Sequence, residues 1–148
     1  MSVSEKIAAD YNVALKAGDK NRVSVLRMIK SSMKYKEIEK KSPLTDDEVQ
    51  AILLSAVKRA KESIEQFSKA GREDLAGKER EEMLVVQDYL PKQLGEDDVK
   101  KILQEVIAAE GASGPKDTGR VMKSAMARLK GQADGKLVSR IVKELLEA

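Results

Sequence analysis

The chain has 148 residues, the size of one ordinary domain or of two small ones. It contains no cysteine, histidine or tryptophan, which excludes a disulfide framework, a thiolate nucleophile, an imidazole base and a Cys/His zinc site. Charged residues make up 36% of the chain and the net charge is +3, a composition typical of a soluble helical protein.

Neither a membrane span nor a secretory signal is expected. The longest stretch without a charge is nine residues, 49–57, whereas a membrane-spanning helix needs about 20. The first six residues, Met-Ser-Val-Ser-Glu-Lys, contain no apolar segment. The cytosol is therefore the predicted location.

Apolar residues recur at intervals of three and four, which predicts helices, and Pro43, Pro91 and Pro115 mark boundaries between them. No segment alternates with period two for long enough to form a strand. The predicted fold class is all-α, with helices over residues 4–17, 20–40, 45–70, 73–89, 97–110, 118–130 and 134–146.

Local patterns specify the faces and ends of some of these helices. Thr45 and Glu48 have the spacing of a capping box, in which each side chain bonds the other's backbone amide. Asp134 is the expected N-cap of the last helix. The inner faces of the first two helices are expected to carry Val3, Ile7, Tyr11, Ala14 and Leu15, and Val23, Leu26, Ile29 and Met33.

The chain is predicted to divide near residues 91–95, because the third and fourth helices are long and the last three are short. We expect an N-terminal bundle of long helices over residues 1–94. A small three-helix domain is expected over residues 95–148, close to the lower size limit for independent folding.

The charge is unevenly distributed in the C-terminal part. Residues 95–110 contain two basic and five acidic residues, whereas residues 116–143 contain eight basic and two acidic ones. At 100° per residue, the cations of the last two helices lie opposite their apolar stripes. These cations are predicted to bind the phosphates of a nucleic acid: Lys116, Arg120, Lys123, Lys130, Lys136, Arg140 and Lys143.

Three glycines next to these cations, Gly119, Gly131 and Gly135, are expected to let the two backbones approach each other. Stacking on bases is not expected, because this region contains no aromatic residue. The alternative is that the charges simply lie on the solvent side, as on any surface helix.

A secondary basic cluster, Arg27, Lys30 and Lys34, shares one face of the second predicted helix. The alternative here is that the acidic third and fourth helices pack alongside and neutralise it.

No catalytic residue, metal ligand or cofactor site is predicted. The serines have no histidine as a base and none lies in a glycine-rich elbow. The acidic runs 46–48 and 96–98 both lie at predicted helix starts, where acids favour the helix dipole. No glycine-rich phosphate loop is present.

Several motifs resemble the YqeY family of small bacterial proteins: Arg-Val-Ser-Val-Leu-Arg-Met-Ile-Lys-Ser at 22–31, Gly-Arg-Glu-Asp-Leu at 71–75 and Tyr-Leu-Pro-Lys-Gln-Leu at 89–94. Two more are similar to the GatB/YqeY tail domain, which this family shares with the aspartyl/glutamyl-tRNA amidotransferase. These are Gly-Arg-Val-Met-Lys at 119–123 and Lys-Gly-Gln-Ala-Asp-Gly-Lys-Leu-Val at 130–138.

The resemblance implies two all-helical domains and a tail that contacts the body of tRNA, while the chemistry of the amidotransferase takes place elsewhere. Only the basic tail positions, 116–143, carry over, and no catalytic residue does. The leading hypothesis is a non-catalytic accessory protein that binds tRNA or contacts a tRNA-charging or amidotransferase assembly. The alternatives are a component of a carbon–nitrogen ligase with glutamine as amido donor, and a protein-interaction module unrelated to RNA.

Overall fold

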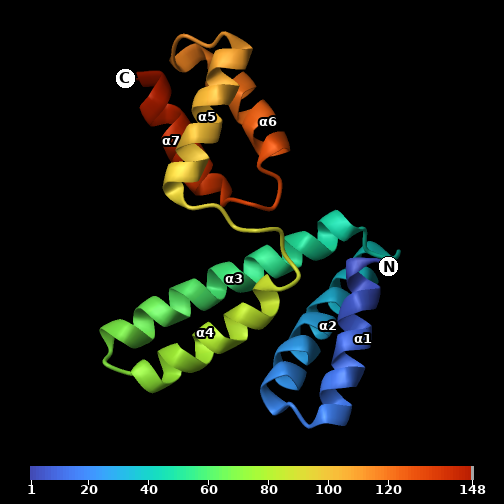
Figure 1. Cartoon of the computed structure of the whole chain (residues 1–148). Coiled ribbons are helices and arrows are strands. Elements are labelled where there is room, and N and C mark those ends of the chain that lie inside the picture. Colours follow the sequence, from blue (N-terminus) through green and yellow to red (C-terminus); the bar gives the residue numbers. More distant parts are fainter. Residues whose placement is uncertain (148) are drawn as a thin grey trace. The chain divides into compact units, whose positions relative to one another are not determined.

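A computed structural model describes residues 1–147, and within them every regular element is a helix (Figure 1). This confirms the all-α class. Each helix end lies within two residues of its predicted position. The elements are α1 (Val3–Ala17), α2 (Lys20–Lys40), α3 (Asp46–Lys69), α4 (Glu73–Gln87), α5 (Glu96–Glu110), the 3₁₀ turn η1 (Pro115–Asp117), α6 (Thr118–Arg128) and α7 (Gly135–Glu147).

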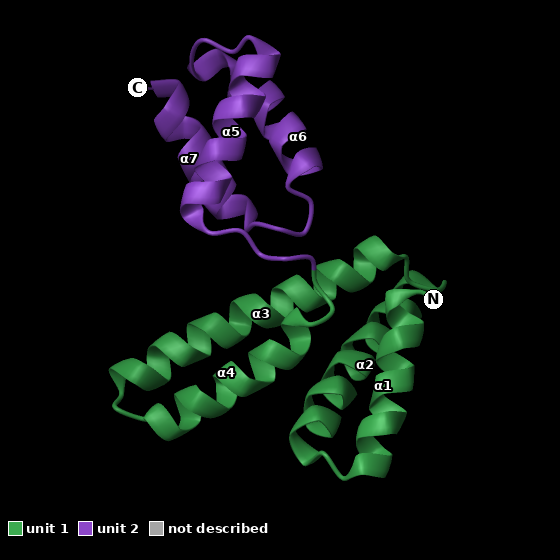
Figure 2. Ribbon diagram, in the orientation of Figure 1, with its two compact units in different colours: residues 1–90 green, residues 91–148 purple. Residues whose placement is uncertain are grey.

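The chain forms two compact units, Met1–Leu90 and the part from Pro91 onward (Figure 2). The first contains α1 to α4 and the second contains α5 to α7. Each unit has its own apolar core.

The first unit consists of two antiparallel helical hairpins, α1–α2 and α3–α4 (Figure 1). Its core includes the fully buried Ile7, Leu26, Ile29, Val49 and Leu53. The prediction for Leu15 is wrong, since this side chain is 46% exposed. Ile7, Tyr11 and Ala14 form a narrow stripe at helical spacing, and Leu15 lies about 100° beyond Ala14.

Two helix starts in the first unit show how capping works here. Ser2 and Glu5 form a full capping box at α1. At α3, the Thr45 hydroxyl accepts from the Glu48 amide at 3.2 Å, as predicted. The Glu48 carboxylate, however, accepts from the Thr45 hydroxyl and from Lys40 Nζ, at 3.2 and 2.5 Å. Its side chain therefore links α2 to α3.

Tyr89, just after the end of α4, contacts α1 through a hydrogen bond and a cation–π interaction. Its hydroxyl donates to Asp10 Oδ2 at 2.5 Å, and Lys6 Nζ lies 5.6 Å from the ring centroid. Burial, helped by the bond to Asp10, raises the pKa of Tyr89 to about 12.

We predict that Tyr89→Phe removes part of the alkaline loss of stability. In the unfolded chain Tyr89 ionises near its ordinary pKa of 10, whereas in the folded chain it keeps its proton until about pH 12. The folded state therefore loses stability relative to the unfolded state as pH rises from 10 to 12. Urea unfolding at several pH values should give a shallower decline for Tyr89→Phe, and Tyr35→Phe, whose ring is 73% exposed, is the control. Equal declines in wild type and Tyr89→Phe would contradict this.

The core of the second unit forms where α5 packs on α6 and α7. Val99 and Leu103 of α5, Val121 and Ala125 of α6 and Val138 of α7 have no exposed surface. Asp134 caps α7 as predicted, since its carboxylate accepts from the Lys136 amide at 3.2 Å.

Residues 92–94 are hydrogen-bonded to the turn after α6. The Leu94 amide donates to the Gln132 carbonyl at 2.9 Å, and the Gln93 side-chain amide donates to the Gly131 carbonyl at 2.6 Å. Leu94 also packs against the core of the second unit. These residues therefore belong to the second unit by contact.

The predicted domains 1–94 and 95–148 remain a prediction that fragments can test. We expect a fragment of residues 91–148 to fold and to melt above a fragment of residues 95–148, because the shorter one lacks Leu94 and the bonds to Gly131 and Gln132. Far-ultraviolet circular dichroism against temperature measures this. Identical melting curves would show that residues 91–94 contribute nothing to folding of this unit.

Candidate nucleic-acid interface

All seven predicted phosphate-binding cations have exposed side chains. Lys116 lies in η1, Arg120 and Lys123 lie on α6, and Lys130 lies in the turn that follows. Lys136, Arg140 and Lys143 are spaced three and four residues apart on α7, so their side chains share one helix face.

The structure brings the three α7 cations together around an open depression. Its volume is about 460 Å³ and it is lined by Gly135, Lys136, Ser139, Arg140 and Lys143. A hydroxyl and three cationic side chains on one wall are groups that bind phosphate oxygens.

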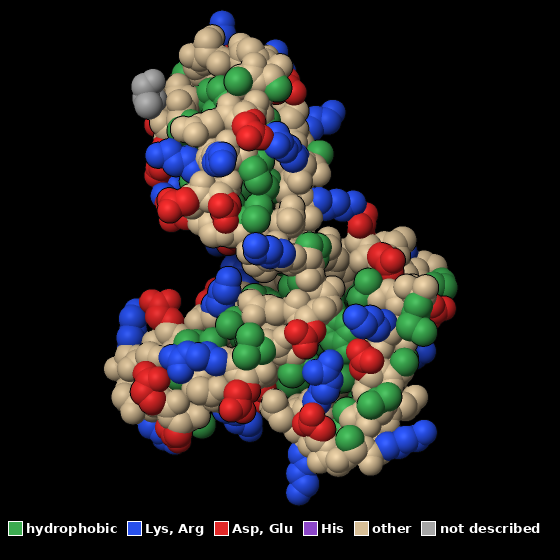
Figure 3. Space-filling view, viewed as in Figure 1, with side chains coloured by type: hydrophobic (Ala, Val, Ile, Leu, Met, Phe, Trp, Pro, Cys, Tyr) green, Lys and Arg blue, Asp and Glu red, His purple; other side chains and the backbone are tan. Residues whose placement is uncertain are grey.

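The arginines of this unit already have acidic partners, and each arginine has one of them on α5. Arg120 lies 3.7 Å from Glu110, Arg140 lies 2.7 Å from Glu96, and Arg128 pairs with Glu105. Arg120 and Arg140 also reach Asp117 and Glu144, at 3.3 and 3.0 Å. Acidic and basic side chains accordingly lie next to one another on the visible face of this unit (Figure 3).

The pKa shifts agree with this geometry. The pKa of Arg140 is raised, chiefly by its hydrogen bond to Glu96 and then by that to Glu144. The pKa of Asp117 is lowered, first by the hydrogen bond from the Ser113 amide at 3.0 Å. The charges of Arg120 and Arg140 are thus partly compensated within the unit.

The lysines differ from the arginines. Within residues 1–147, Lys123, Lys136 and Lys143 form no ion pair or side-chain hydrogen bond. Their ammonium groups keep their full charge and all their donors for a ligand. Among the predicted residues, these three lysines are the strongest candidates for phosphate contacts.

The three predicted glycines have different surroundings. Gly131 has φ +72°, a left-handed conformation that favours glycine, and its carbonyl accepts from Gln93. A Cβ on Gly119 would meet nothing within 4 Å, and one on Gly135 would meet only Met126 Cε at 3.8 Å. Gly131 therefore has a structural role, whereas the space beside Gly119 and Gly135 is open.

We predict opposite effects for Gly131→Ala and Gly119→Ala. Alanine at position 131 is strained by its left-handed backbone and should lower the free energy of unfolding by about 1 kcal/mol. At position 119 it adds helix propensity in open space and should be neutral or stabilising by about 0.5 kcal/mol. Urea unfolding measures both. A loss of stability in Gly119→Ala equal to that in Gly131→Ala would contradict the assignment.

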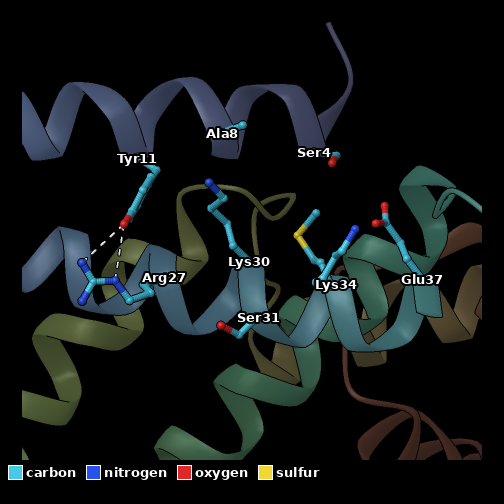
Figure 4. A pocket seen from close by; sticks show the side chains of 9 residues that line it. Ser4, Ala8, Tyr11, Arg27, Lys30, Ser31, Lys34 and Glu37 are labelled. Atoms are coloured by element: carbon cyan, nitrogen blue, oxygen red, sulfur yellow. Dashed lines mark hydrogen bonds between the residues drawn. The ribbon is translucent and has the colours of Figure 1, made fainter. Parts of the chain in front are cut away.

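The secondary cluster lies in the first unit and faces α1. Arg27, Lys30 and Lys34 line a groove between α1 and α2 (Figure 4). Among the residues that the structure describes, none of the three pairs with an acid of α3 or α4. Ion pairs with these two helices therefore do not compensate the cluster within the described residues.

The acidic runs serve as helix starts. Asp46 Oδ1 accepts from the Val3 amide at 3.3 Å, and Glu48 bonds Lys40. In the described part of the chain, no three His, Cys, Asp or Glu side chains are placed to hold one metal ion, and no helix has the length and apolarity to cross a bilayer.

An all-helical protein with a lysine-bearing C-terminal unit is thus the class that fold and surface define. The chain belongs to the YqeY-like family: the sequence model of this family, described as "Yqey-like protein", matches residues 4–146. This confirms the resemblance found in the sequence.

Named relatives come from fungi and an archaeon. The "Altered inheritance of mitochondria protein 41, mitochondrial" of Pyrenophora tritici-repentis is 29% identical over 99% of this chain and 82% of that protein. Its namesake from Vanderwaltozyma polyspora is 32% identical over 73% of this chain and 62% of that protein. Because these relatives are named as mitochondrial, the predicted cytosolic location and bacterial origin stay predictions.

A third relative is named as part of an amidotransferase. It is a glutamyl-tRNA(Gln) amidotransferase subunit of Thermococcus gammatolerans, 32% identical over 76% of this chain but only 19% of that protein. Residues 95–148 are little more than a third of the chain. The similarity therefore also includes part of the first unit.

Proposed function

We propose that this protein is a non-catalytic accessory protein that binds tRNA through the lysines of its C-terminal unit. The observation that carries the proposal is the set of uncompensated cations Lys123, Lys136 and Lys143, two of which line the α7 depression. Lys116 and Lys130 extend this basic surface, and the arginines beside it are paired with acids of α5.

Two further points support tRNA as the ligand. The unit contains no aromatic side chain for base stacking, so it suits a folded RNA recognised by its shape and phosphates. The similarity to an amidotransferase component named for glutamyl-tRNA(Gln) points to the same class of RNA.

We predict that replacing Lys123, Lys136 and Lys143 by Gln weakens binding to unfractionated tRNA and flattens its salt dependence. Each lost phosphate contact reduces the slope of log K against log salt by about 0.9, so three reduce it by about 2.7. Fluorescence anisotropy at several salt concentrations measures both quantities on the full chain.

The matched control is Lys92→Gln, Lys100→Gln and Lys101→Gln, which removes the same charge from exposed positions of the same unit. The control should keep most of the wild-type slope. Equal slopes for wild type and the Lys123, Lys136 and Lys143 variant would remove these lysines as the site, and absence of binding at low salt would remove tRNA as the ligand.

The amidotransferase relative favours a second candidate, a role as a component of a tRNA-dependent carbon–nitrogen ligase with glutamine as amido donor. On this hypothesis, added protein changes the rate of amide formation on mischarged tRNA by a complete amidotransferase. An unchanged rate, together with a protein complex that survives nuclease treatment, would favour an interaction module unrelated to RNA.

A further inference from the structure

A cationic groove lies along the α1–α2 hairpin of the first unit (Figure 4). Its volume is about 420 Å³. On the α1 side the groove is lined by the small side chains of Ser4 and Ala8, and Tyr11 closes one end of the groove. The α2 side carries Arg27, Lys30, Ser31, Met33, Lys34 and Glu37.

Tyr11 holds two of these cations without neutralising them. Its hydroxyl accepts from Arg27 Nε and Nη2 at 3.3 and 3.4 Å, and Lys30 Nζ lies 4.2 Å from its ring centroid. A carboxylate in this place would fix the cations and cancel their charge. A phenol fixes them and leaves the charge in place.

The groove therefore carries an excess of positive charge. Within residues 1–147, Arg27, Lys30 and Lys34 form no ion pair, and Glu37 is the one acid that lines the groove. Arg27 donates two of its five N–H groups to Tyr11, which leaves three for a ligand. The arginines of the C-terminal unit, by contrast, are bound to carboxylates.

The arrangement of the cations favours a chain of phosphates over a single one. From Arg27 to Lys34 they extend over seven residue-to-residue steps of α2, about 10 Å along the helix axis. The groove is open along its length, whereas sites for small molecules bury most of the ligand. Lys30 covers one face of Tyr11, so this ring does not serve as a platform for a base.

We propose that the α1–α2 groove binds the phosphodiester backbone of a single nucleic-acid strand. Arg27, Lys30 and Lys34 contact successive phosphates, and Tyr11 is a positioning residue for the first two. The groove shares no residue with the surface on α6 and α7 and depends on the proposed function only for the class of ligand.

The test uses the full chain and a uridine oligomer of about ten nucleotides, labelled for anisotropy. Three phosphate contacts to a single strand give a slope of log K against log salt of about −2. Lys30→Gln with Lys34→Gln should make the slope shallower by about 1.4 and reduce affinity at least five-fold at ~50 mM salt. A cytidine oligomer should bind equally well, since phosphates carry no base sequence.

The matched control is Lys58→Gln with Lys61→Gln, which removes two exposed charges from α3. The measurement is repeated in the chain that carries Lys123→Gln, Lys136→Gln and Lys143→Gln. There the groove effect should persist, so that failure of the tRNA surface and failure of the groove are distinguished. A wild-type slope in Lys30→Gln with Lys34→Gln, or an equal loss in the control, overturns the proposal.

Tyr11→Phe tests the positioning role. It keeps the ring beneath Lys30 and removes the acceptor of Arg27, so it should weaken oligomer binding two- to three-fold while the melting temperature stays within a degree or two. Unchanged binding overturns this role.

A glutamate peptide with the same number of charges as the oligomer is the remaining comparison. If the peptide binds at the groove and the oligomer does not, the groove is a site for an acidic protein segment and the proposal is wrong.

Discussion

The apolar stripe of α5 determines which cations of the C-terminal unit remain available. Val99, Leu103 and Val106 must be buried, and they fix the rotation of α5 against α6 and α7. That rotation turns three acids of α5, Glu96, Glu105 and Glu110, toward the neighbouring helices, where each of the three meets an arginine. Charge compensation is therefore a consequence of core packing. Within residues 1–147, Lys123, Lys136 and Lys143 form no ion pair with an acid of α5.

The division between arginine and lysine has a chemical basis. The guanidinium group is planar and offers several donors in a fixed geometry, which suits a carboxylate on a neighbouring helix. Lysine has one flexible, strongly hydrated charge, and it loses little by remaining in water. Ion pairs as exposed as these contribute little to stability. Their main effect on this unit is to lower the positive potential around Arg120 and Arg140 and leave it highest around the lysines.

Sequence periodicity predicts the helices of this protein well, because each has an apolar stripe and a clear stop signal. It predicts less about which stripe residues are buried: Leu15 is exposed, and Val25, outside the predicted stripe, is buried. The ion pairs of Arg120 with Glu110 and of Arg140 with Glu96 could not be predicted, since they depend on how α5 packs. The residues that face each other across the α1–α2 groove, by contrast, could be predicted from the sequence. With the turn at Asp19, positions 11 and 27 are equally distant from it, as are 8 and 30, and 4 and 34, so an antiparallel hairpin places them opposite each other.

Both proposed surfaces consist of cations suited to phosphates, and neither provides an aromatic platform for reading bases. Such binding is weak for each surface, depends on salt and has no preference for sequence. Selectivity must then come from the shape of the RNA or from simultaneous contact with both units. Because both surfaces belong to one chain, an RNA that reaches the two of them binds the second at a high effective concentration, which raises the affinity without any new contact. A tRNA carries many more phosphates than a ten-nucleotide strand and so offers more ways to contact two surfaces at once. The ratio of the two affinities is therefore the quantity in which cooperation between the units would appear.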